Sequence, residues 1–499
     1  VGPQRRAHDP AGGNVSAHAI VPGAVVLGAG ANELVAAHTL ARAGHKVLVL
    51  DAHALHDDEG WIPPQIARDL GLHRAGLTVA ERDPWLTIPL PDGDRLELTP
   101  DIQQTADAIR RVSPHDADRW PAFCARMARL ARLLEALYMA PPPDPTRRGV
   151  LARFHHLRLG LRVRQLGHEG IPDLLRILPM SIADWLDDWF ETDVLKGALG
   201  AAGIRHLRYG PRAGGTAFAL LHRHVGAMPG VFRPASSDVI RVLSGLPGIE
   251  IRRGAEVAGI NVRAEHVTGV TLANGAHIAA PIVLSGLDPR RTLLELMDTG
   301  WLDPEVTRAV RNIRSRGVTA RVNLTLDRSP GFARLAIAPS LEHLEHASDD
   351  AKYGHISQQP YLEARAGEPT LDGRHRVEVH MQYAPYALAD GEWDAARRGA
   401  LGDLVVHALA DHIPGGDAAI TERSVFTPRD LAERAGWPEG QPAHAELALD
   451  QFLWMRPIPA LARYSTPVAG LYLCGPAMHP GGDIVGAAGA NAAREILRA

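Results

Sequence analysis

Cysteine is scarce in this sequence: Cys124 and Cys474 are the only two cysteines among 499 residues. They lie far apart and belong to no paired cysteine motif, which argues against a disulfide framework and a cysteine-based zinc site. Such sparse cysteine usage is typical of proteins from reducing compartments, and we therefore expect a cytoplasmic location.

Long apolar runs and an excess of basic charge are also missing. No stretch reaches the ~18 apolar residues that a membrane-spanning helix needs. The formal net charge of −4 gives no basis for nucleic-acid binding. Residues 1–23 lack the apolar centre of a secretory signal, and we expect them to be a disordered leader. The motifs G-x-S-x-G, H-E-x-x-H and the P-loop lysine are absent as well, which argues against those hydrolase, metalloprotease and nucleotide-binding classes.

A pattern typical of dinucleotide-binding proteins lies near the amino terminus. Residues 24–30 are predicted to form an apolar strand, residues 32–43 a helix and residues 46–51 a second strand. Together they make a βαβ unit, the beginning of a parallel sheet. In the fingerprint G-x-G-x-x-G, the first two glycines form a turn that approaches a diphosphate, and the third lets the helix pack closely on the strand.

The fingerprint is incomplete here. Gly28 and Gly30 are present, and Asp51 ends the second strand, where an acid can bind ribose hydroxyls. The third glycine is replaced by Glu33, whose carboxylate would lie close to a diphosphate and repel it. Taken alone, the pattern also fits a βαβ unit that binds nothing, with Asp51 acting as a helix cap.

A second glycine-rich element lies at the carboxyl end. A strand ending at Gly475 is followed by Gly481, Gly482 and a glycine-bearing helix start at residues 486–494. Backbone amides in such turns can form a second anion-binding cradle. A site built from both ends of the chain predicts that the domains are interleaved and that the middle of the sequence is an insertion.

The middle of the chain alternates between helical and strand-like patterns. Pro114 and Pro121 punctuate a helical stretch, and the pair Asn274-Gly275 predicts a hairpin turn. The predicted helices cover residues 64–71, 101–139 and much of 150–228, and the predicted strands lie within residues 249–286, 318–326 and 375–383.

Most of the chain resembles the FAD-dependent phytoene desaturase-like proteins of the amine-oxidase superfamily. It is most similar to their pyridine nucleotide-disulfide oxidoreductase domain 2 branch, which is related to phytoene dehydrogenases. The resemblance rests on Val25 to Asp51 and Leu471 to Asn491, and on short strings such as Arg311 to Arg314, Gln382 to Tyr386 and Met455 to Pro457.

The resemblance implies an α/β fold, with a Rossmann-like FAD-binding domain of the glutathione-reductase type and an inserted α+β substrate domain. The FAD-binding domain would comprise residues 24–140, 245–290 and 465–499, and the substrate or lid domain residues 141–244 and 291–464. The residues expected to bind FAD are Gly28, Gly30, Asn32, Glu33, Asp51, Val257, Gly475, Gly481, Gly482, Asp483 and Ile484.

The sequence departs from the family pattern at three places around the expected flavin. Glu33 replaces a glycine, the loop from Ala52 to Trp61 lacks roughly two dozen residues that the family has there, and Pro229 to Asp238 replaces a glycine-rich loop. Loop trimming on this scale usually removes function rather than fold. We therefore expect a degenerate site that holds FAD weakly or not at all.

Two functions remain open. One is an FAD-dependent oxidoreductase of the desaturase or dehydrogenase type that acts on an apolar small molecule, with His479 and Tyr383 as candidate catalytic residues. For His479, a role in turn formation is the alternative. The other is a family member that has lost flavin and serves as a binding or partner protein, or as a cofactor-independent isomerase or hydrolase.

Further partners follow from two local patterns. The basic, apolar-interleaved segment 153–164 could contact a membrane surface, although an exposed helix or lid is the plainer interpretation. A homo-oligomer or a protein partner is compatible with the sequence. His53 and His56 precede the acids Asp57 to Glu59, but their spacing matches no established metal site, and no metal is predicted.

Overall fold

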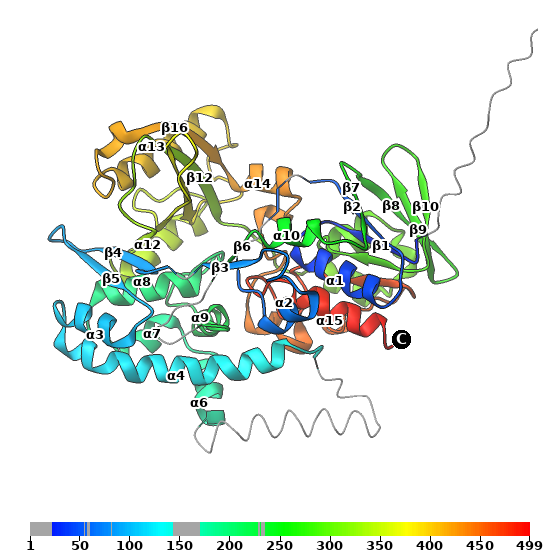
Figure 1. The fold of residues 1–499 in the computed structure, drawn as a ribbon, viewed down its shortest axis with the longest axis horizontal. Coiled ribbons are helices and arrows are strands. Elements are labelled where there is room, and N and C mark those ends of the chain that lie inside the picture. Colours follow the sequence, from blue (N-terminus) through cyan, green and yellow to red (C-terminus); the bar gives the residue numbers. More distant parts are fainter. Residues whose placement is uncertain are drawn as a thin grey trace, which may run out of the picture.

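The structure is a computed structural model that describes residues 22–53, 55–56, 60–80, 82–142, 170–227, 230 and 235–499. Residues 1–21 of the expected leader and the basic segment 153–164 lie outside the described residues. Figure 1 shows one part built around β1, β2 and α1 and another that carries β12, β16 and α13.

A parallel sheet takes its strands from the beginning, the middle and the end of the chain. Its order is β17-β11-β1-β2-β7, and every neighbouring pair is parallel. The strands are β1 (Ala24–Leu27), β2 (Val47–Asp51), β7 (Glu250–Arg253), β11 (Val283–Ser285) and β17 (Leu471–Leu473). The two glycine-rich ends of the sequence therefore lie side by side.

The predicted βαβ unit is confirmed with slightly shorter elements. Strand β1 ends at Leu27 because Gly28 turns the chain with φ +96°, a conformation that favours glycine. Helix α1 (Ala31–Arg42) follows and packs against α15 (Ala487–Ile496). At the crossing, a Cβ on Gly489 would overlap the backbone of Asn32, so this glycine permits the close approach of the two helices.

A small antiparallel sheet contains the predicted hairpin. Gly275 adopts φ +84°, and the amide of Leu272 donates to the carbonyl of Ala276 at 2.9 Å, which closes the turn. The strands are β8 (Val257–Arg263), β9 (His266–Leu272) and β10 (His277–Ala279), in the order β10-β9-β8. The predicted strand region is thus confirmed.

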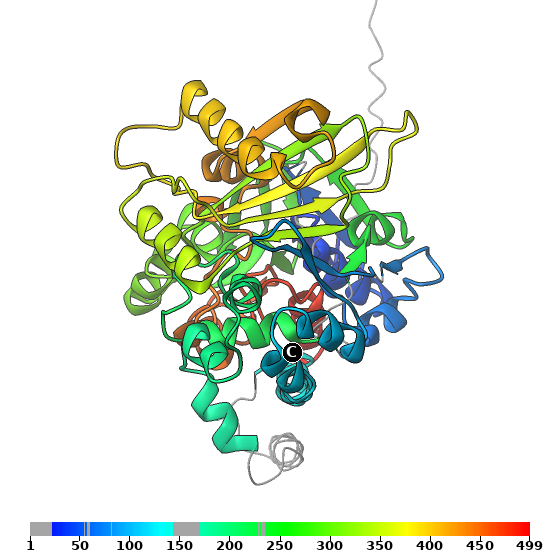
Figure 2. The ribbon, with the colours of Figure 1, turned by 90° about the vertical axis from the view of Figure 1, so that its left-hand side faces the viewer.

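The second large sheet has seven strands in the order β16-β12-β15-β14-β13-β4-β5. The predicted strands at 318–326 and 375–383 are its β12 and β15, which pair antiparallel along their whole length. The strands are β4 (Leu86–Pro89), β5 (Arg95–Leu98), β12 (Thr319–Leu326), β13 (Arg334–Ile337), β14 (Leu362–Ala366), β15 (His375–Gln382) and β16 (Ile420–Phe426). In Figure 2 the yellow and orange strands of this sheet cross the upper part of the molecule.

Strands β4 and β5 were not anticipated from the sequence. They lie within residues 24–140, which we expected to belong to the FAD-binding domain, yet they join the seven-stranded sheet through β13. Figure 1 shows them on the opposite side of the molecule from β1 and β2. Each strand is only four residues long, and only β5 alternates between buried and exposed residues, which is too short a pattern for a reliable strand signal.

The helical stretch predicted over 101–139, with interruptions at Pro114 and Pro121, is interrupted only before Pro114 and forms two helices. Helix α3 (Ile102–Arg110) ends before Ser113, whose hydroxyl caps α4 (Pro114–Tyr138) by accepting from the amide of Asp116 at 3.1 Å. Pro114 occupies the first turn of α4, where its missing N–H costs nothing, and Pro121 is accommodated inside the helix.

The other helices include the predicted one at 64–71 and cover both sheets. They are α2 (Pro64–Leu70), α6 (Gly170–Ile177), α7 (Ile182–Asp187), α8 (Asp193–Ile204), α9 (Thr216–His224), α10 (Val239–Gly245), α11 (Pro304–Arg311), α12 (Leu341–Lys352), α13 (Ala395–Ala410) and α14 (Pro428–Ala435). A short two-stranded ribbon pairs β3 (Thr78–Ala80) with β6 (Ala235–Ser237). Among the described residues, no helix is long and apolar enough to cross a membrane.

The fold class is therefore α/β, with a Rossmann-like domain and a second domain around the seven-stranded sheet. One large apolar cluster includes β1, β2, α1 and α15, and a separate cluster lies between the seven-stranded sheet and α13. In such folds, ligands bind at the carboxyl ends of the parallel strands. The candidate site lies there.

Candidate functional site

A cavity of about 140 Å³ lies at the carboxyl ends of the parallel strands. Its walls come from the glycine turn after β1, the end of β2, the start of β8 and the loop between β17 and α15. The expected FAD-binding residues that line it are Gly28, Gly30, Asn32, Glu33, Asp51, Val257, Gly481, Gly482, Asp483 and Ile484. The fold thus brings residues from both ends of the chain to one cavity.

Gly475, unlike the other expected FAD-binding residues, does not line the cavity in the described part of the chain. It follows β17, and a Cβ added to it would overlap the carbonyl oxygen of Gly286, which follows β11. Gly475 therefore allows two neighbouring strand ends to approach each other. Within the described part of the chain it supports the cavity wall and is not part of the lining.

The side chain of Glu33 folds back onto the glycine turn. A Cβ built on Gly30 would lie 2.5 Å from the Glu33 Oε2 atom, and a Cβ on Gly286 would overlap the same carboxyl group. The backbone amides of Gly30 and of Glu33 itself interact with the carboxylate and favour its charged form. Glu33 is 5% exposed, and this burial raises its pKa to about 7.

Asp51 forms a charged group with residues from outside its own strand. Its Oδ2 atom lies 3.1 Å from Nε2 of His56 and 3.4 Å from Nη1 of Arg253, while its Oδ1 atom is buried without a hydrogen-bond partner among the described residues. Burial alone would lower the pKa of His56, but the hydrogen bond and charge of Asp51 outweigh it and raise that pKa. Glu33 acts in the same direction.

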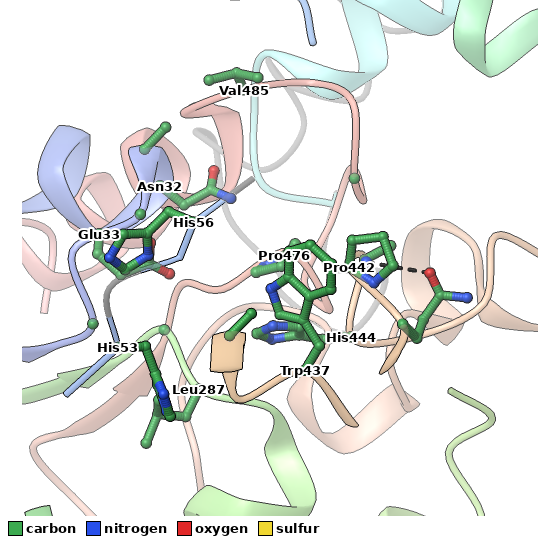
Figure 3. Close-up of a pocket in the computed structure, with 18 of the residues that line it drawn as sticks. Asn32, Glu33, His53, His56, Leu287, Trp437, Pro442, His444, Pro476 and Val485 are labelled. Atoms are coloured by element: carbon green, nitrogen blue, oxygen red, sulfur yellow. Dashed lines mark hydrogen bonds between the residues drawn. The ribbon is translucent and has the colours of Figure 1, made fainter. Parts of the chain in front are cut away.

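The loop after Asp51 supplies His53 and His56 to the cavity lining. Figure 3 shows His56 beside Glu33 and His53 beside Leu287. The loop then reaches Trp61, whose amide donates to the carbonyl of Asp483 and whose carbonyl accepts from Val485, both at 2.9 Å. These backbone hydrogen bonds therefore connect the loop to the carboxyl-terminal half of the site.

The loop of Gly481 and Gly482 rests on a fully buried arginine. The guanidinium of Arg456 donates only to backbone carbonyls, and no carboxylate lies within ion-pair distance of it in the described residues. These carbonyls belong to Ala445, Glu446, Gln451, Pro476 and Met478. Burial without a counterion lowers the pKa of Arg456 to about 10.

Two further contacts fix the same loop. Nε2 of His222 on α9 lies 2.8 Å from the carbonyl of Gly482, and its Nδ1 lies 2.8 Å from the hydroxyl of Tyr138. Nη1 of Arg223 forms an ion pair with Oδ2 of Asp483 at 2.8 Å. The adjacent His222 and Arg223 thus hold consecutive residues of the loop in place.

The two candidate catalytic residues lie outside the lining of this cavity, as far as the described residues go. His479 is fully buried, its Nε2 lies 3.2 Å from the carbonyl of Leu137, and burial lowers its pKa to about 4. The hydroxyl of Tyr383 donates to the carbonyl of Tyr209 at 2.7 Å, and burial raises its pKa well above the usual value. Both side chains make hydrogen bonds within the fold, and their catalytic role stays a prediction.

One wall of the cavity was not anticipated from the sequence. Trp437, Pro442 and His444 come from the segment after α14, and Figure 3 shows them together with Pro476. His444 is buried, and its Nδ1 atom has no hydrogen-bond partner in the part of the chain that is described; burial lowers its pKa to about 3. No periodic or glycine-rich pattern marks this irregular segment, so the sequence offered no signal for it.

Several known proteins are similar to this sequence over most of its length. A family model described as flavin containing amine oxidoreductase matches residues 65–497. The pyridine nucleotide-disulfide oxidoreductase domain-containing protein 2 of Rattus norvegicus is 31% identical, covering 95% of this chain and 93% of its own length. Hydroxyneurosporene desaturase of Cereibacter sphaeroides is 28% identical, with coverages of 96% and 98%. A limonene dehydrogenase component of Castellaniella defragrans is 24% identical, with coverages of 95% and 94%.

Solved structures share the fold at lower identity. A triple mutant of putrescine oxidase superposes with a TM-score of 0.59 at 15% identity, covering 96% of this chain and 99% of that one. Cyclohexylamine oxidase of Brevibacterium oxydans gives a TM-score of 0.53 at 14% identity, with coverages of 96% and 100%. At such identities the likeness establishes the fold alone.

Proposed function

The chain belongs to the family of flavin-containing amine oxidoreductases, and on this basis we propose that it oxidises an apolar small molecule by desaturation or dehydrogenation, using an FAD that it binds weakly. The observation that supports this best is the single cavity that joins Gly28, Asp51 and Gly481. A turn for a diphosphate, an acid for a ribose and a glycine loop from the far end of the chain meet there.

The residues around the cavity fit most of an FAD molecule. The buried Oδ1 atom of Asp51 has no hydrogen-bond partner in the described parts of the chain, and neither has Oδ1 of Asn32. Gly28 and Gly30 carry no side chain that would cover the turn, and α1 directs its amino-terminal amides towards it. Asp51 and the backbone of Val257 would hold the adenosine end, and Gly481 and Gly482 the flavin end.

Glu33 is the residue that fits poorly, because its carboxylate occupies the space beside Gly30 and interacts with the Gly30 amide. This observation supports weak binding of FAD. It also supports a second candidate, a flavin-free family member that acts as a binding protein or as a cofactor-independent isomerase or hydrolase.

The chain's own residues prepare the cavity for redox chemistry. When bound, the flavin supplies the electron acceptor for hydride removal. Trp437, Pro442 and Pro476 contribute apolar surface to the cavity lining, which supports an apolar substrate. Arg456, His222 and Arg223 hold the loop of Gly481 to Asp483 in one position. The names of the relatives, a desaturase and a limonene dehydrogenase, support the same class of reaction.

The visible spectrum of the purified protein tests the proposal. We expect a colourless preparation, or one with less than one FAD per chain, that becomes yellow after incubation with excess FAD and gel filtration at low temperature. A stoichiometric FAD that survives dialysis would overturn weak binding. Failure to bind FAD at saturating concentration would favour the flavin-free candidate.

A further inference from the structure

The carboxylate of Glu33 stands where a bound anion would stand. It lies between the Gly28 turn and Gly286, with Oε2 2.5 Å from the position of a Cβ on Gly30, and the amides of Gly30 and Glu33 at the start of α1 favour its charged form. Amides at the start of a helix are the groups that bind phosphate in dinucleotide sites, because the helix dipole and the free N–H groups both favour negative charge. The chain therefore provides its own anion to these donors.

The groups that face Glu33 come from several elements. Asp51 at the end of β2 and His56 in the following loop interact with it electrostatically, with opposite signs. Arg253 on β7 lies behind Asp51, and the thiol of Cys474 after β17 is buried close enough for the Glu33 charge to raise its pKa. His56 is the nearest positive partner, and Asp51 shares it.

We propose that the Glu33 carboxylate and the diphosphate of FAD compete for the same backbone amides, so that FAD binds to this chain together with a proton that is taken up by Glu33. This inference rests on the proposed function, since it takes FAD as the ligand of the cavity. No other residue has to titrate for the exchange: the neutral carboxyl either donates to a phosphate oxygen or swings away from the turn.

Burial and charge both favour this exchange. A buried Glu33 has a pKa of about 7, so roughly half of the free protein already carries the proton near neutral pH. A diphosphate beside it would raise the pKa further, because two negative groups in one low-dielectric site repel each other. Binding is therefore strongest below pH 7, where Glu33 is neutral, and weakens above it, where each binding event must first protonate the side chain.

The test is FAD binding to the full chain, measured by quenching of flavin fluorescence and by calorimetry between pH 6 and pH 8.5. With one proton taken up, the Kd should rise about thirtyfold over this range and approach tenfold per pH unit at its upper end. Calorimetry at pH 8 in buffers with different ionisation enthalpies should report an uptake of nearly one proton. At pH 6 the uptake should be close to zero.

Glu33→Gln is the matched variant, because it keeps the shape of the side chain and removes the titration. Its Kd should be nearly independent of pH and close to the wild-type value at pH 6. Any remaining change of Kd with pH gives the contribution of His56 titration. Glu368→Gln, which removes the same charge from an exposed loop, should behave like the wild type. A Kd that is equally pH-dependent in wild type and Glu33→Gln, or flat in both, would overturn the inference while leaving FAD binding intact. If neither protein binds FAD at any pH, the proposed function itself fails.

Discussion

The guanidinium of Arg456 lies directly beneath Gly481, with its Cζ atom 3.1 Å from the position that a Cβ would occupy on that glycine. Gly481 has φ +114°, so both its conformation and its missing side chain are required there. The contact joins a fully buried cation to the loop that closes the cavity.

Gly481→Ala should therefore destabilise the protein by about 2 kcal/mol or more, because it adds backbone strain and a collision with Arg456. Urea unfolding measures the loss. Gly373→Ala is the control: Gly373 also has a positive φ, of +77°, but its Cβ would meet no described atom within 4 Å. Equal losses in the two variants would show that the contact with Arg456 is unimportant.

Arg456→Met should cost about 3 kcal/mol or more, since it leaves several buried carbonyls without their donor. Arg456→Lys should lose less, because an ammonium can still donate to some of them, although it lacks the planar fork of arginine. Thermal and urea unfolding of both variants checks the order. If Met is tolerated as well as Lys, the carbonyls are satisfied in another way.

Stability should fall as the pH drops from about 6.5 to 4.5. His444 and His479 have folded pKa values of about 3 and about 4, so in this pH range the two side chains are protonated in the unfolded chain and neutral in the folded chain. Glu33 acts oppositely, because its folded pKa of about 7 makes the folded chain bind a proton first. For these three groups together, the net difference of one proton gives a slope of about 1.4 kcal/mol per pH unit.

Urea unfolding at several pH values measures this slope, and Glu33→Gln sharpens the test. Without the proton that Glu33 binds in the folded chain, the change of unfolding free energy with pH should approach the value for a difference of two protons. A wild-type protein that becomes more stable over the same range would contradict the assignment of His444 and His479 as neutral buried groups.

Asp51→Asn should lower the pKa of His56, because burial then acts without the hydrogen bond and charge that offset it. The titration of the His56 ring followed by NMR gives the answer. Arg253→Gln should shift the same pKa slightly upwards, since Arg253 repels the protonated ring. If both variants shift it in one direction, Asp51 is not the dominant partner.

Glu33→Gly should tighten FAD binding by about tenfold at pH 8, because Glu33 is mostly ionised there and the variant removes the competing carboxylate. We do not expect family-like affinity, since the shortened loop after Asp51 brings fewer amide donors to the cofactor. Fluorescence titration with FAD measures the change. Unchanged or weaker binding would show that Glu33 supports the site and does not compete for it.

Local patterns in the sequence determined the parallel sheet and the location of the site. The apolar run of β1, the glycines after it and the acid after β2 are short-range features, and each specifies a turn or strand with few neighbours involved. The matching glycines near residue 481 then required the two ends of the chain to meet. The βαβ unit, Gly28, Gly30 and Asp51 follow from these features, whereas the complete fold class and the rest of the expected cofactor residues came from the resemblance to a known family.

Only the tertiary structure decided what fills the cavity. The sequence marked Glu33 as a replaced glycine, but its contact with the Gly30 amide depends on where Gly286 and α1 lie. His444 and Trp437 belong to an irregular segment with no periodic pattern. His479 and Tyr383 lie outside the described cavity lining, with carbonyls from distant parts of the chain close to their polar atoms. Such contacts join residues that are far apart in the chain. They depend on how whole helices and strands pack, and no local sequence pattern specifies that packing.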